Sequence, residues 1–316
     1  MGKSTLKKPC FLYLIIMINI SIIGNGYHTN KNLKPSIDRS NEFKIDKIIS
    51  RNDYSKLDVF EYLISESKTD FVIISTPPSV HCEVAESLLN IGMPTIVEKP
   101  FGINKDEVET TIKNFEKKGV PIMEGLMFLY HPYIDIQKKL INSNINYRIE
   151  TEFIIPFPEN KNFRVSNSPE SGSILDTGIY LIAQFYELGF TNPKIKIENS
   201  KRPFDTFGEI RGKNNKGSFL GKWGFSDHYK NYLKIVIGEY VHNFNFNYSK
   251  PLTHKHIYEV FKKDKLEKET EYTNINQFIN MYKFFNKTNT DEIFKLTTDK
   301  TLMRWELIDK IKRNEY

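Results

Sequence analysis

The sequence predicts an α/β plus α+β protein, in which a parallel sheet with crossover helices precedes an open antiparallel sheet. From residue 17 to about 125, short apolar runs alternate with amphipathic stretches that end at glycines. Such alternation is typical of a parallel sheet with crossover helices. After about residue 130, strand-like segments follow one another with turn signals between them. We therefore expect one domain over 17–125 and a second over 126–316.

The candidate elements follow from these patterns in order. The first part predicts parallel strands at 18–24, 44–50, 71–76, 95–99 and 120–125. Helical spacing between them predicts helices over 58–67, 80–92 and 105–119. The second part predicts strands at 147–157, 194–200, 206–212, 217–225, 232–239 and 240–248, and a final helix over about 291–313.

Composition excludes several classes of protein. A content of 39% hydrophobic and 27% charged residues is that of a folded globular chain, not a disordered one. The net charge of +6 comes from lysines scattered among acidic residues, without the basic clusters and interleaved aromatics that bind nucleic acid. The two cysteines, Cys10 and Cys82, imply no disulfide framework. We therefore expect a cytoplasmic protein, in a reducing compartment, with no nucleic-acid partner.

The N-terminus has the outline of a secretory signal or membrane anchor, because basic residues precede an apolar run. The run continues without a break into "GNGYH", so cleavage nearby would remove the first predicted strand. We favour a start at Met17, with 1–16 as a non-native or disordered extension and no membrane attachment. An exported form is the alternative.

The glycine turn "GNGYHT" follows the first strand. Gly24 and Gly26 allow a tight turn and let a pyrophosphate approach the backbone at a helix N-terminus, and we expect Tyr27 to border the same ligand. Thr29 stands where the usual fingerprint has a third glycine or alanine, which predicts looser packing of helix on strand. The turn alone fits an ordinary strand-to-helix connection equally well.

The end of the second strand bears on the choice of cofactor. It reads "SRND", without the acidic residue that holds a ribose 2′-hydroxyl. Ser50 and Arg51 are suited to a 2′-phosphate, since a guanidinium forms charge-matched paired hydrogen bonds with phosphate. We therefore favour NADP(H) over NAD(H), although an exposed arginine would have the same pattern.

Two further strand ends supply residues to the same crevice, because a doubly wound sheet binds its ligand at the carboxyl ends of its strands. "TPPSVH" places Thr76, Pro77 and His81 beside the cofactor, with helix capping as the alternative for His81. "EKP" places Glu98 and Lys99 at the mouth of the next strand. A positioned ammonium there would stabilise the charge that develops on a carbonyl or alcohol oxygen.

The glycine turn, "TPPSVH", "EKP" and the later "LDTGIY" together resemble the Gfo/Idh/MocA family of nicotinamide-dependent oxidoreductases, over residues 17 to about 315. The resemblance implies a Rossmann-type domain followed by an open-sheet domain, with Lys99 touching nicotinamide and substrate. Asp176 and Tyr180 match the family's D-x-G-x-[H/Y] motif, which makes Tyr180 the general acid. We expect Lys99 to lower the pKa of Tyr180. The alternative is a purely structural role, with Tyr180 as a core residue and Asp176 as a cap in a buried helix.

Within the family, segments such as "MEGLMFLYHPY" and the block "FRVSNSPESGSILDTGIY" resemble the NDP-hexose 3-ketoreductases. The resemblance implies NADPH-dependent reduction of a nucleotide-linked 3-keto-deoxyhexose, with Arg164 binding substrate or cofactor. Ser171 and Ser173 replace a double glycine, which predicts altered loop geometry. The alternatives are an NAD(P)-dependent dehydrogenase of a free sugar, polyol or trans-dihydrodiol, and a non-catalytic cofactor-bound sensor.

Two other features carry weaker expectations. His254 and His256 would share one face of a strand, but no further ligand has suitable spacing, so we favour a surface or substrate-lining role and expect no metal. The alternation in "YVHNFNFNY" suggests a sheet face that needs cover, which predicts a homodimer or homotetramer.

Overall fold

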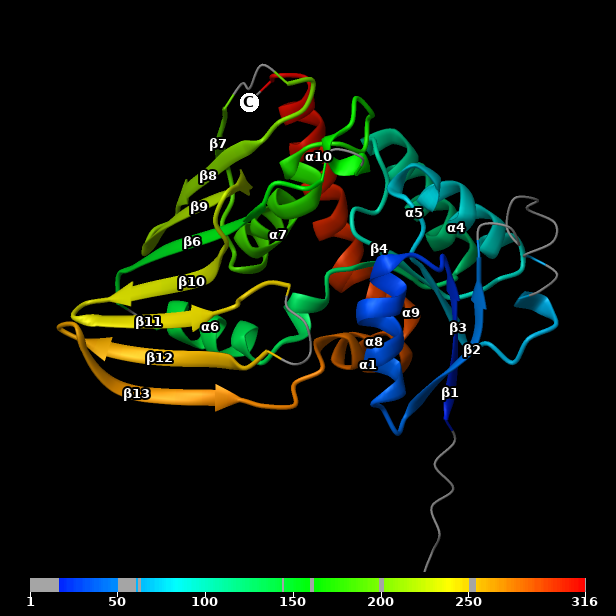
Figure 1. Ribbon diagram of the computed structural model, residues 1–316, viewed down its shortest axis with the longest axis horizontal. Helices are drawn as coiled ribbons and strands as arrows, with labels where there is room; N and C mark the ends of the chain where they lie inside the picture. The colour runs from blue at the N-terminus through cyan, green and yellow to red at the C-terminus, as the bar shows by residue number, and fades with distance from the viewer. Residues whose placement is uncertain are drawn as a thin grey trace, which may run out of the picture.

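The chain forms two sheets, arranged side by side with helices between and around them (Figure 1). The structure is a computed structural model that describes residues 17–50, 61, 64–143, 145–159, 162–198, 202–249 and 254–315. The predicted fold class is confirmed: a parallel sheet of the Rossmann type is followed by a larger, mainly antiparallel sheet.

The first sheet contains five parallel strands in the order β2-β1-β3-β4-β5. All five predicted strands are present, as β1 (Ile18–Ile23), β2 (Phe43–Ile49), β3 (Phe71–Ile74), β4 (Thr95–Glu98) and β5 (Ile122–Gly125). The chain moves from β1 outward to β2 and then to the other side of β1, where β3 pairs Ile22 with Ile73. This reversal creates a crevice at the carboxyl ends of β1 and β3, where such sheets bind ligands.

Helices from both ends of the chain cover the first sheet. The connections between its strands contribute η1 (Thr29–Leu33), α1 (Lys34–Asp38), η2 (Pro78–Val80), α4 (His81–Asn90) and α5 (Lys105–Lys118). Helix α8 (Gln277–Lys287) returns from the far end of the chain, so that Tyr282 lies 6.0 Å from Phe43 and Phe285 lies 5.3 Å from Phe71 between ring centroids. All residues of β3 and β4 are buried as a result, as expected for a parallel sheet covered on both faces.

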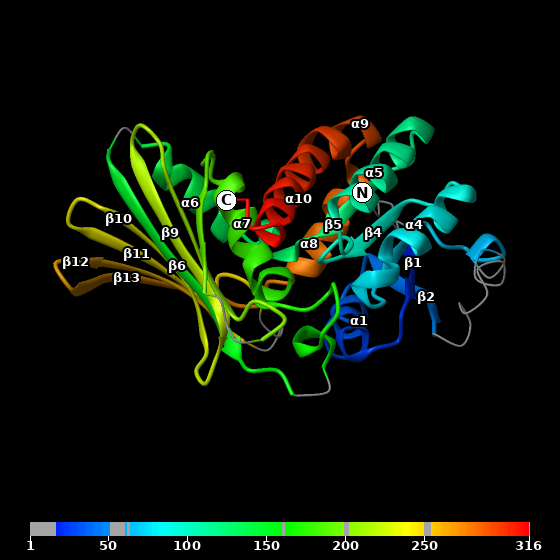
Figure 2. The ribbon, with the colours of Figure 1, turned by 90° about the horizontal axis from the view of Figure 1, so that it is seen from above.

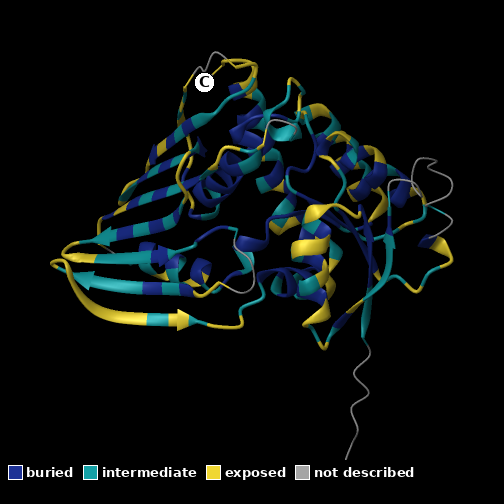
Figure 3. Cartoon of the chain, in the orientation of Figure 1, coloured by how far each residue is buried: buried dark blue, intermediate teal, exposed yellow. Residues whose placement is uncertain are grey.

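The second sheet contains eight strands in the order β13-β12-β11-β10-β6-β9-β8-β7. The strands are β6 (Tyr147–Pro156), β7 (Lys194–Ile197), β8 (Phe207–Lys213), β9 (Gly217–Ser226), β10 (Lys230–Ile237), β11 (Tyr240–Asn245), β12 (His256–Lys262) and β13 (Lys265–Tyr272). Its central pair, β6 and β9, is parallel, whereas the other neighbours are antiparallel. The sequence patterns predicted the first six strands but not β12 and β13, whose outer member is charged and largely exposed (Figure 3).

One face of the second sheet carries η5 (Ile174–Gly178), α7 (Ile179–Glu187) and α6 (Tyr133–Ile141), as Figure 2 shows. Close packing there depends on Gly178, because a Cβ atom at this position would lie 2.9 Å from the buried Trp223 ring. Three buried amides join the helices to the sheet in a closed cycle. Gln137 donates to Asn247 at 2.7 Å, Asn247 donates to Gln184 at 3.1 Å, and Gln184 donates to Gln137 at 3.1 Å.

The end of the chain connects the two sheets. The predicted final helix is present as α9 (Thr290–Ile293), η6 (Phe294–Thr298) and α10 (Asp299–Lys312). Arg304 of α10 donates from Nη2 to Glu124 Oε2 at 2.6 Å, and both side chains are almost fully buried. The other oxygen of Glu124 accepts from the backbone N–H of Phe101 at 2.9 Å. Among the described residues, no helix is both long and apolar enough to cross a membrane.

Candidate functional site

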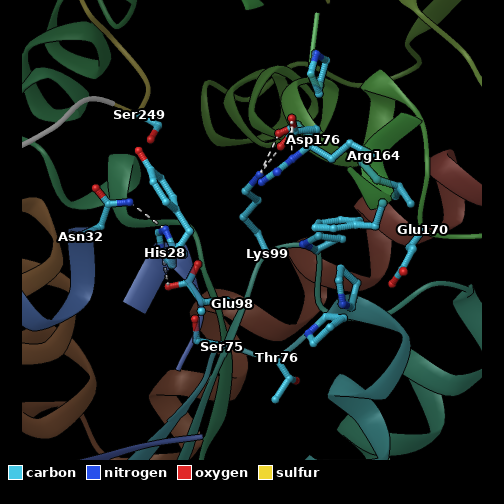
Figure 4. Close-up of a pocket in the computed structure, with 18 of the residues that line it drawn as sticks. His28, Asn32, Ser75, Thr76, Glu98, Lys99, Arg164, Glu170, Asp176 and Ser249 are labelled. Atoms are coloured by element: carbon cyan, nitrogen blue, oxygen red, sulfur yellow. Dashed lines mark hydrogen bonds and ion pairs between the residues drawn. The ribbon is translucent and has the colours of Figure 1, made fainter. Parts of the chain in front are cut away.

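A cleft of about 900 Å³ opens where the carboxyl ends of β1, β3 and β4 face the second sheet (Figure 4). The cleft gathers the expected site residues that the structure describes, namely Gly24, Gly26, Tyr27, Ser50, Thr76, Pro77, His81, Glu98, Lys99, Arg164, Asp176 and Tyr180. Arg51 lies outside the described residues. The location is that expected for a ligand of a doubly wound sheet.

The glycine turn brings the backbone at Gly24 close to the end of β3. Gly24 has φ of +112°, and a Cβ atom there would lie 2.3 Å from the carbonyl oxygen of Ser75. A Cβ atom on Gly26 would meet nothing within 4 Å, so this side of the turn is open to the cleft. The expected loose packing at Thr29 is wrong. Thr29 is fully buried, and its hydroxyl donates to Gly24 O at 2.7 Å and to Ser75 Oγ at 3.1 Å, so the extra atoms close the turn.

His81 has a structural position beneath the cleft. Its ring places Nδ1 2.9 Å from the carbonyl oxygen of Pro100 and Nε2 2.8 Å from that of Thr76. The capping alternative is wrong, because α4 begins at His81 and has no side-chain cap. Burial lowers the pKa of His81. The ring lies between the "TPP" turn and the "EKP" turn, and in its neutral form it donates to one of these two carbonyl oxygens.

Lys99 reaches across the cleft to Asp176. Its Nζ donates to Asp176 Oδ1 at 3.0 Å and to the Asp176 carbonyl oxygen at 2.9 Å. Nε of Arg164 lies 3.0 Å from the second carboxylate oxygen, Oδ2. Burial alone would raise the pKa of Asp176, but the charges of Lys99 and Arg164 outweigh it and hold the pKa below its usual value. The carboxylate therefore stays ionised and orients both cations.

Tyr180 lies next to this ion cluster. Nζ of Lys99 is 5.0 Å from the centroid of its ring, and the side chain is only 3% exposed. The expected lowering of its pKa is wrong. Burial raises the pKa of Tyr180 well above its usual value, and the negative charges of Glu98 and Asp176 raise it further. The phenol therefore keeps its proton at neutral pH, which is the state that a general acid requires.

The segment that carries Arg164 is held by its own serines. Ser171 Oγ donates to Phe163 O at 2.7 Å, and Ser173 Oγ donates to Asp205 Oδ2 at 2.5 Å. Both serines are buried. The serine hydroxyls that replace the double glycine thus form hydrogen bonds within this segment. They do not keep the loop away from the cleft.

Sequence reasoning missed four polar residues of the cleft. His28, Asn32, Glu170 and Ser249 all line it, and all are labelled in Figure 4. Asn32 Nδ2 lies 3.0 Å from His28 Nδ1, and His28 Nε2 lies 3.4 Å from Glu98 Oε1. Glu170 accepts from the backbone N–H of Ser79 at 3.1 Å, so the loop of Arg164 contacts the first domain. His28 and Asn32 follow the glycine turn, and Glu170 lies within the block "FRVSNSPESGSILDTGIY", so these three were accessible to sequence reasoning.

The cleft contains polar atoms suited to a bound cofactor. Within the described ranges, Thr76 Oγ1 is buried without a hydrogen bond, and so are His28 Nε2 and Glu98 Oε1, which face each other at 3.4 Å. Buried polar groups are normally hydrogen-bonded, so such a cluster beside the open glycine turn indicates that a polar ligand completes the site. The residues present therefore fit a dinucleotide.

The histidine pair near the second sheet differs from expectation. His256 is the first residue of β12 and is buried, whereas His254 precedes the strand and is exposed, so the two do not share a strand face. The His256 ring instead lies 4.4 Å from that of His131. No cluster of three or more metal-ligating side chains occurs in the part of the chain that the structure describes.

The fold and the cleft define a two-domain dinucleotide-binding protein. Residues 18–126 match the Gfo/Idh/MocA model, an oxidoreductase family with an NAD-binding Rossmann fold. The match covers the N-terminal domain, which carries the glycine turn, "TPPSVH" and "EKP" on which the resemblance to this family rests.

Curated relatives resemble the chain over limited segments. A D-xylose 1-dehydrogenase (NADP(+)) from Haloferax volcanii is 24% identical over 127 residues, which cover 39% of each chain. A dTDP-3,4-didehydro-2,6-dideoxy-α-D-glucose 3-reductase from Actinomadura kijaniata is 25% identical over 123 residues, which cover 38% of this chain and 37% of the relative. The matched segments thus span less than half the length of these two relatives.

The likeness of fold extends over nearly the whole chain. A variant of KijD10, a 3-ketoreductase from Actinomadura kijaniata solved in complex with TDP-benzene and NADP, superposes with a TM-score of 0.77 at 16% identity. The superposition covers 94% of this chain and 97% of the other. At this identity it establishes the shared fold of both domains.

Proposed function

We propose that the protein reduces a keto-sugar with NADPH. The observation that carries the proposal is the contact of Lys99 with both Asp176 and Tyr180 in the cleft that also contains the Gly24 turn. A dinucleotide site, a positioned ammonium and a protonated phenol are the components that carbonyl reduction requires.

In the proposed reaction, the bound nicotinamide supplies the hydride. Lys99, oriented by Asp176, donates a hydrogen bond to the substrate carbonyl oxygen and stabilises the negative charge that develops there. Tyr180 then gives its phenolic proton to the same oxygen and yields the alcohol. The aromatic and apolar residues around the cleft, including Phe153, limit the access of water.

The substrate we favour is a nucleotide-linked 3-keto-deoxyhexose. Arg164 projects toward the cleft from the second domain and stacks on Phe163 with its guanidinium carbon 4.9 Å from the ring centroid. The lining of the cleft also includes the apolar side chains of Phe153, Pro158 and Tyr229. Such a surface suits a deoxysugar and the base of a nucleotide. The named function of the Actinomadura relative supports this choice, and that of the Haloferax relative supports oxidation of a free sugar as the alternative.

The preference for NADP(H) belongs to the same proposal. It rests on Ser50 and Arg51, which follow β2 directly where an acidic residue would hold a ribose 2′-hydroxyl. The NADP(+)-linked name of the Haloferax relative agrees with it. We further propose that the protein acts in the cytoplasm as a homodimer or homotetramer, with the uncovered face of the second sheet as the contact.

A thermal-shift titration with NADPH and NADH in parallel tests the cofactor, because a ligand that binds the native state raises its melting temperature. A larger shift with NADPH is expected. The substrate is tested next by following NADPH consumption with the dTDP-linked ketosugar, and NADP+ reduction with D-xylose as the matched alternative. Cofactor binding without turnover of either compound would favour the non-catalytic sensor, and the lack of any shift would overturn the dinucleotide site.

A further inference from the structure

Most of the Tyr180 side chain is shielded from solvent. Its ring packs 5.4 Å from Phe128 and 5.1 Å from Phe153 between centroids, and the side chain is almost fully buried. If the phenol protonates the product oxygen, as the proposed function requires, a proton must return to it before the next turnover. A side chain that borders both the phenol and the cleft can carry this proton.

Ser249 occupies the position for such a path. It lies beyond the end of β11, lines the cleft together with Tyr180 and is half-buried, so it borders both the phenol and the solvent of the cleft. Figure 4 shows its hydroxyl directed into the cleft. The Ser249 side chain also forms a hydrogen bond with Tyr180 that partly offsets the rise in the phenol's pKa.

Asn231 fixes the backbone of Ser249 in this position. Its Nδ2 donates to the Ser249 carbonyl oxygen at 3.1 Å and to the Tyr229 hydroxyl at 2.8 Å. Its Oδ1 accepts from the backbone N–H of Tyr248 at 2.9 Å. The side chain of Asn231 is nearly buried, so the segment that carries Ser249 is anchored to β10 rather than free to move away from Tyr180.

We propose that Ser249 relays protons from solvent to Tyr180 during catalysis. A hydroxyl both donates and accepts, so it can pass on one proton while it receives another and stay neutral. As the Ser249 O–H bond breaks, a new O–H bond forms on the Tyr180 phenolate, and a water molecule in the cleft replaces the serine proton. The proton consumed in each reduction thus comes from the solvent, and no further oxidant or reductant takes part.

The electrostatics around Tyr180 make prompt return of the proton necessary. Burial, followed by the charges of Glu98 and Asp176, raises the pKa of the phenol. A phenolate in this position is therefore unfavourable, and a variant without the relay would return the proton to Tyr180 more slowly.

The test compares Ser249→Ala with Ser249→Thr, which keeps a hydroxyl, and with Ser226→Ala as a control. Ser226 is half-buried at the end of β9 and does not line the cleft. With NADPH and the dTDP-linked ketosugar as probe, Ser249→Ala should lower kcat roughly ten- to a hundredfold with little change in KM. It should also increase the effect of D2O on kcat. Ser249→Thr should recover most of the activity, and Ser226→Ala should match wild type.

A second measurement reports on the contact without turnover. In protein labelled with ¹³Cζ-tyrosine, the Tyr180 signal is identified by its loss in Tyr180→Phe, and it should shift in Ser249→Ala. An unshifted signal, or equal kcat and D2O effect in Ser249→Ala and wild type, would overturn the relay alone. An inactive wild-type protein would overturn the proposed function, and the relay with it.

Discussion

The ammonium group of Lys99 lies 3.0 Å from Oδ1 of Asp176, although the two residues are 77 positions apart in the chain. This pair explains why a lysine is stable at the mouth of a buried strand, since its charge is compensated by a carboxylate from the other domain. It also sets the distance between the dinucleotide crevice and the helix that carries Tyr180. The reactive end of the cleft is therefore assembled by contact between domains.

Replacing Tyr180, the proposed acid, should lower the turnover number without weakening the binding of NADPH. Tyr180→Phe removes the hydroxyl but keeps the ring that packs against Phe128 and Phe153. We expect kcat to fall by on the order of 10² or more, because the proton donor is lost, with little change in NADPH affinity. Steady-state kinetics and a fluorescence titration of NADPH measure the two quantities. Near wild-type turnover would eliminate Tyr180 as the acid.

Asp176 should make stability depend on pH in acid. Its pKa is lower in the folded state than in the unfolded chain, so it stabilises the protein above the unfolded pKa, and this contribution is lost as pH falls below about 4. Asp176→Asn should lower the free energy of unfolding at pH 7 by about 1–3 kcal/mol, between the values for exposed and buried pairs. Urea unfolding from pH 7 to pH 3 should show the two proteins converging as the pH falls. A constant difference would contradict the assignment.

The contact between Glu170 and Ser79 should contribute to cofactor retention. It joins the loop of Arg164 to the turn before α4 at the edge of the cleft. Loss of one hydrogen bond costs about 1 kcal/mol, so Glu170→Ala should raise the dissociation constant of NADPH about fivefold. Glu159→Ala, an exposed glutamate outside the cleft lining, is the matched charge control and should leave this constant unchanged. If both variants raised the dissociation constant equally, the effect would come from the change in net charge and not from the hydrogen bond to Ser79.

The buried pair of Arg304 and Glu124 should affect stability strongly. Arg304→Met leaves the Glu124 carboxylate without its cation in a site where both side chains are almost inaccessible. We expect a loss of about 3–5 kcal/mol in the free energy of unfolding, measured by urea denaturation. Combining it with Glu124→Gln should recover part of the loss, because the amide still accepts from Phe101 and buries no charge. A double variant that is less stable than Arg304→Met would contradict this account.

The elements that sequence patterns predicted are those whose signal is local. The run that forms β3 is apolar at every position, since helices cover both faces of the sheet, and the glycine turn marks where β1 ends. The pairing of Lys99 with Asp176 was foreseen because both belong to motifs of one family. By contrast, β13 is charged and largely exposed, and no apolar periodicity distinguishes it from a loop.

The parts of the site that escaped prediction depend on tertiary contacts. Ser249 and Glu170 are held at the cleft by contacts with Asn231 and Ser79, which the sequence pattern does not reveal. The direction of the Tyr180 pKa shift required knowledge of its burial, which outweighs the charge of Arg164. Thr29 was misjudged because its hydroxyl has an acceptor inside the turn, which the spacing of glycines does not reveal.

The cover that α8 gives to the first sheet has a consequence for biosynthesis. Phe43 and Phe71 are synthesised early, but Tyr282 and Phe285, which pack on them, leave the ribosome after the entire second sheet. During that interval the nascent chain presents an aromatic surface without its partner, which is the kind of surface that molecular chaperones bind. A fragment that stopped after β5 would expose the same surface permanently, so we expect it to aggregate when it is expressed alone.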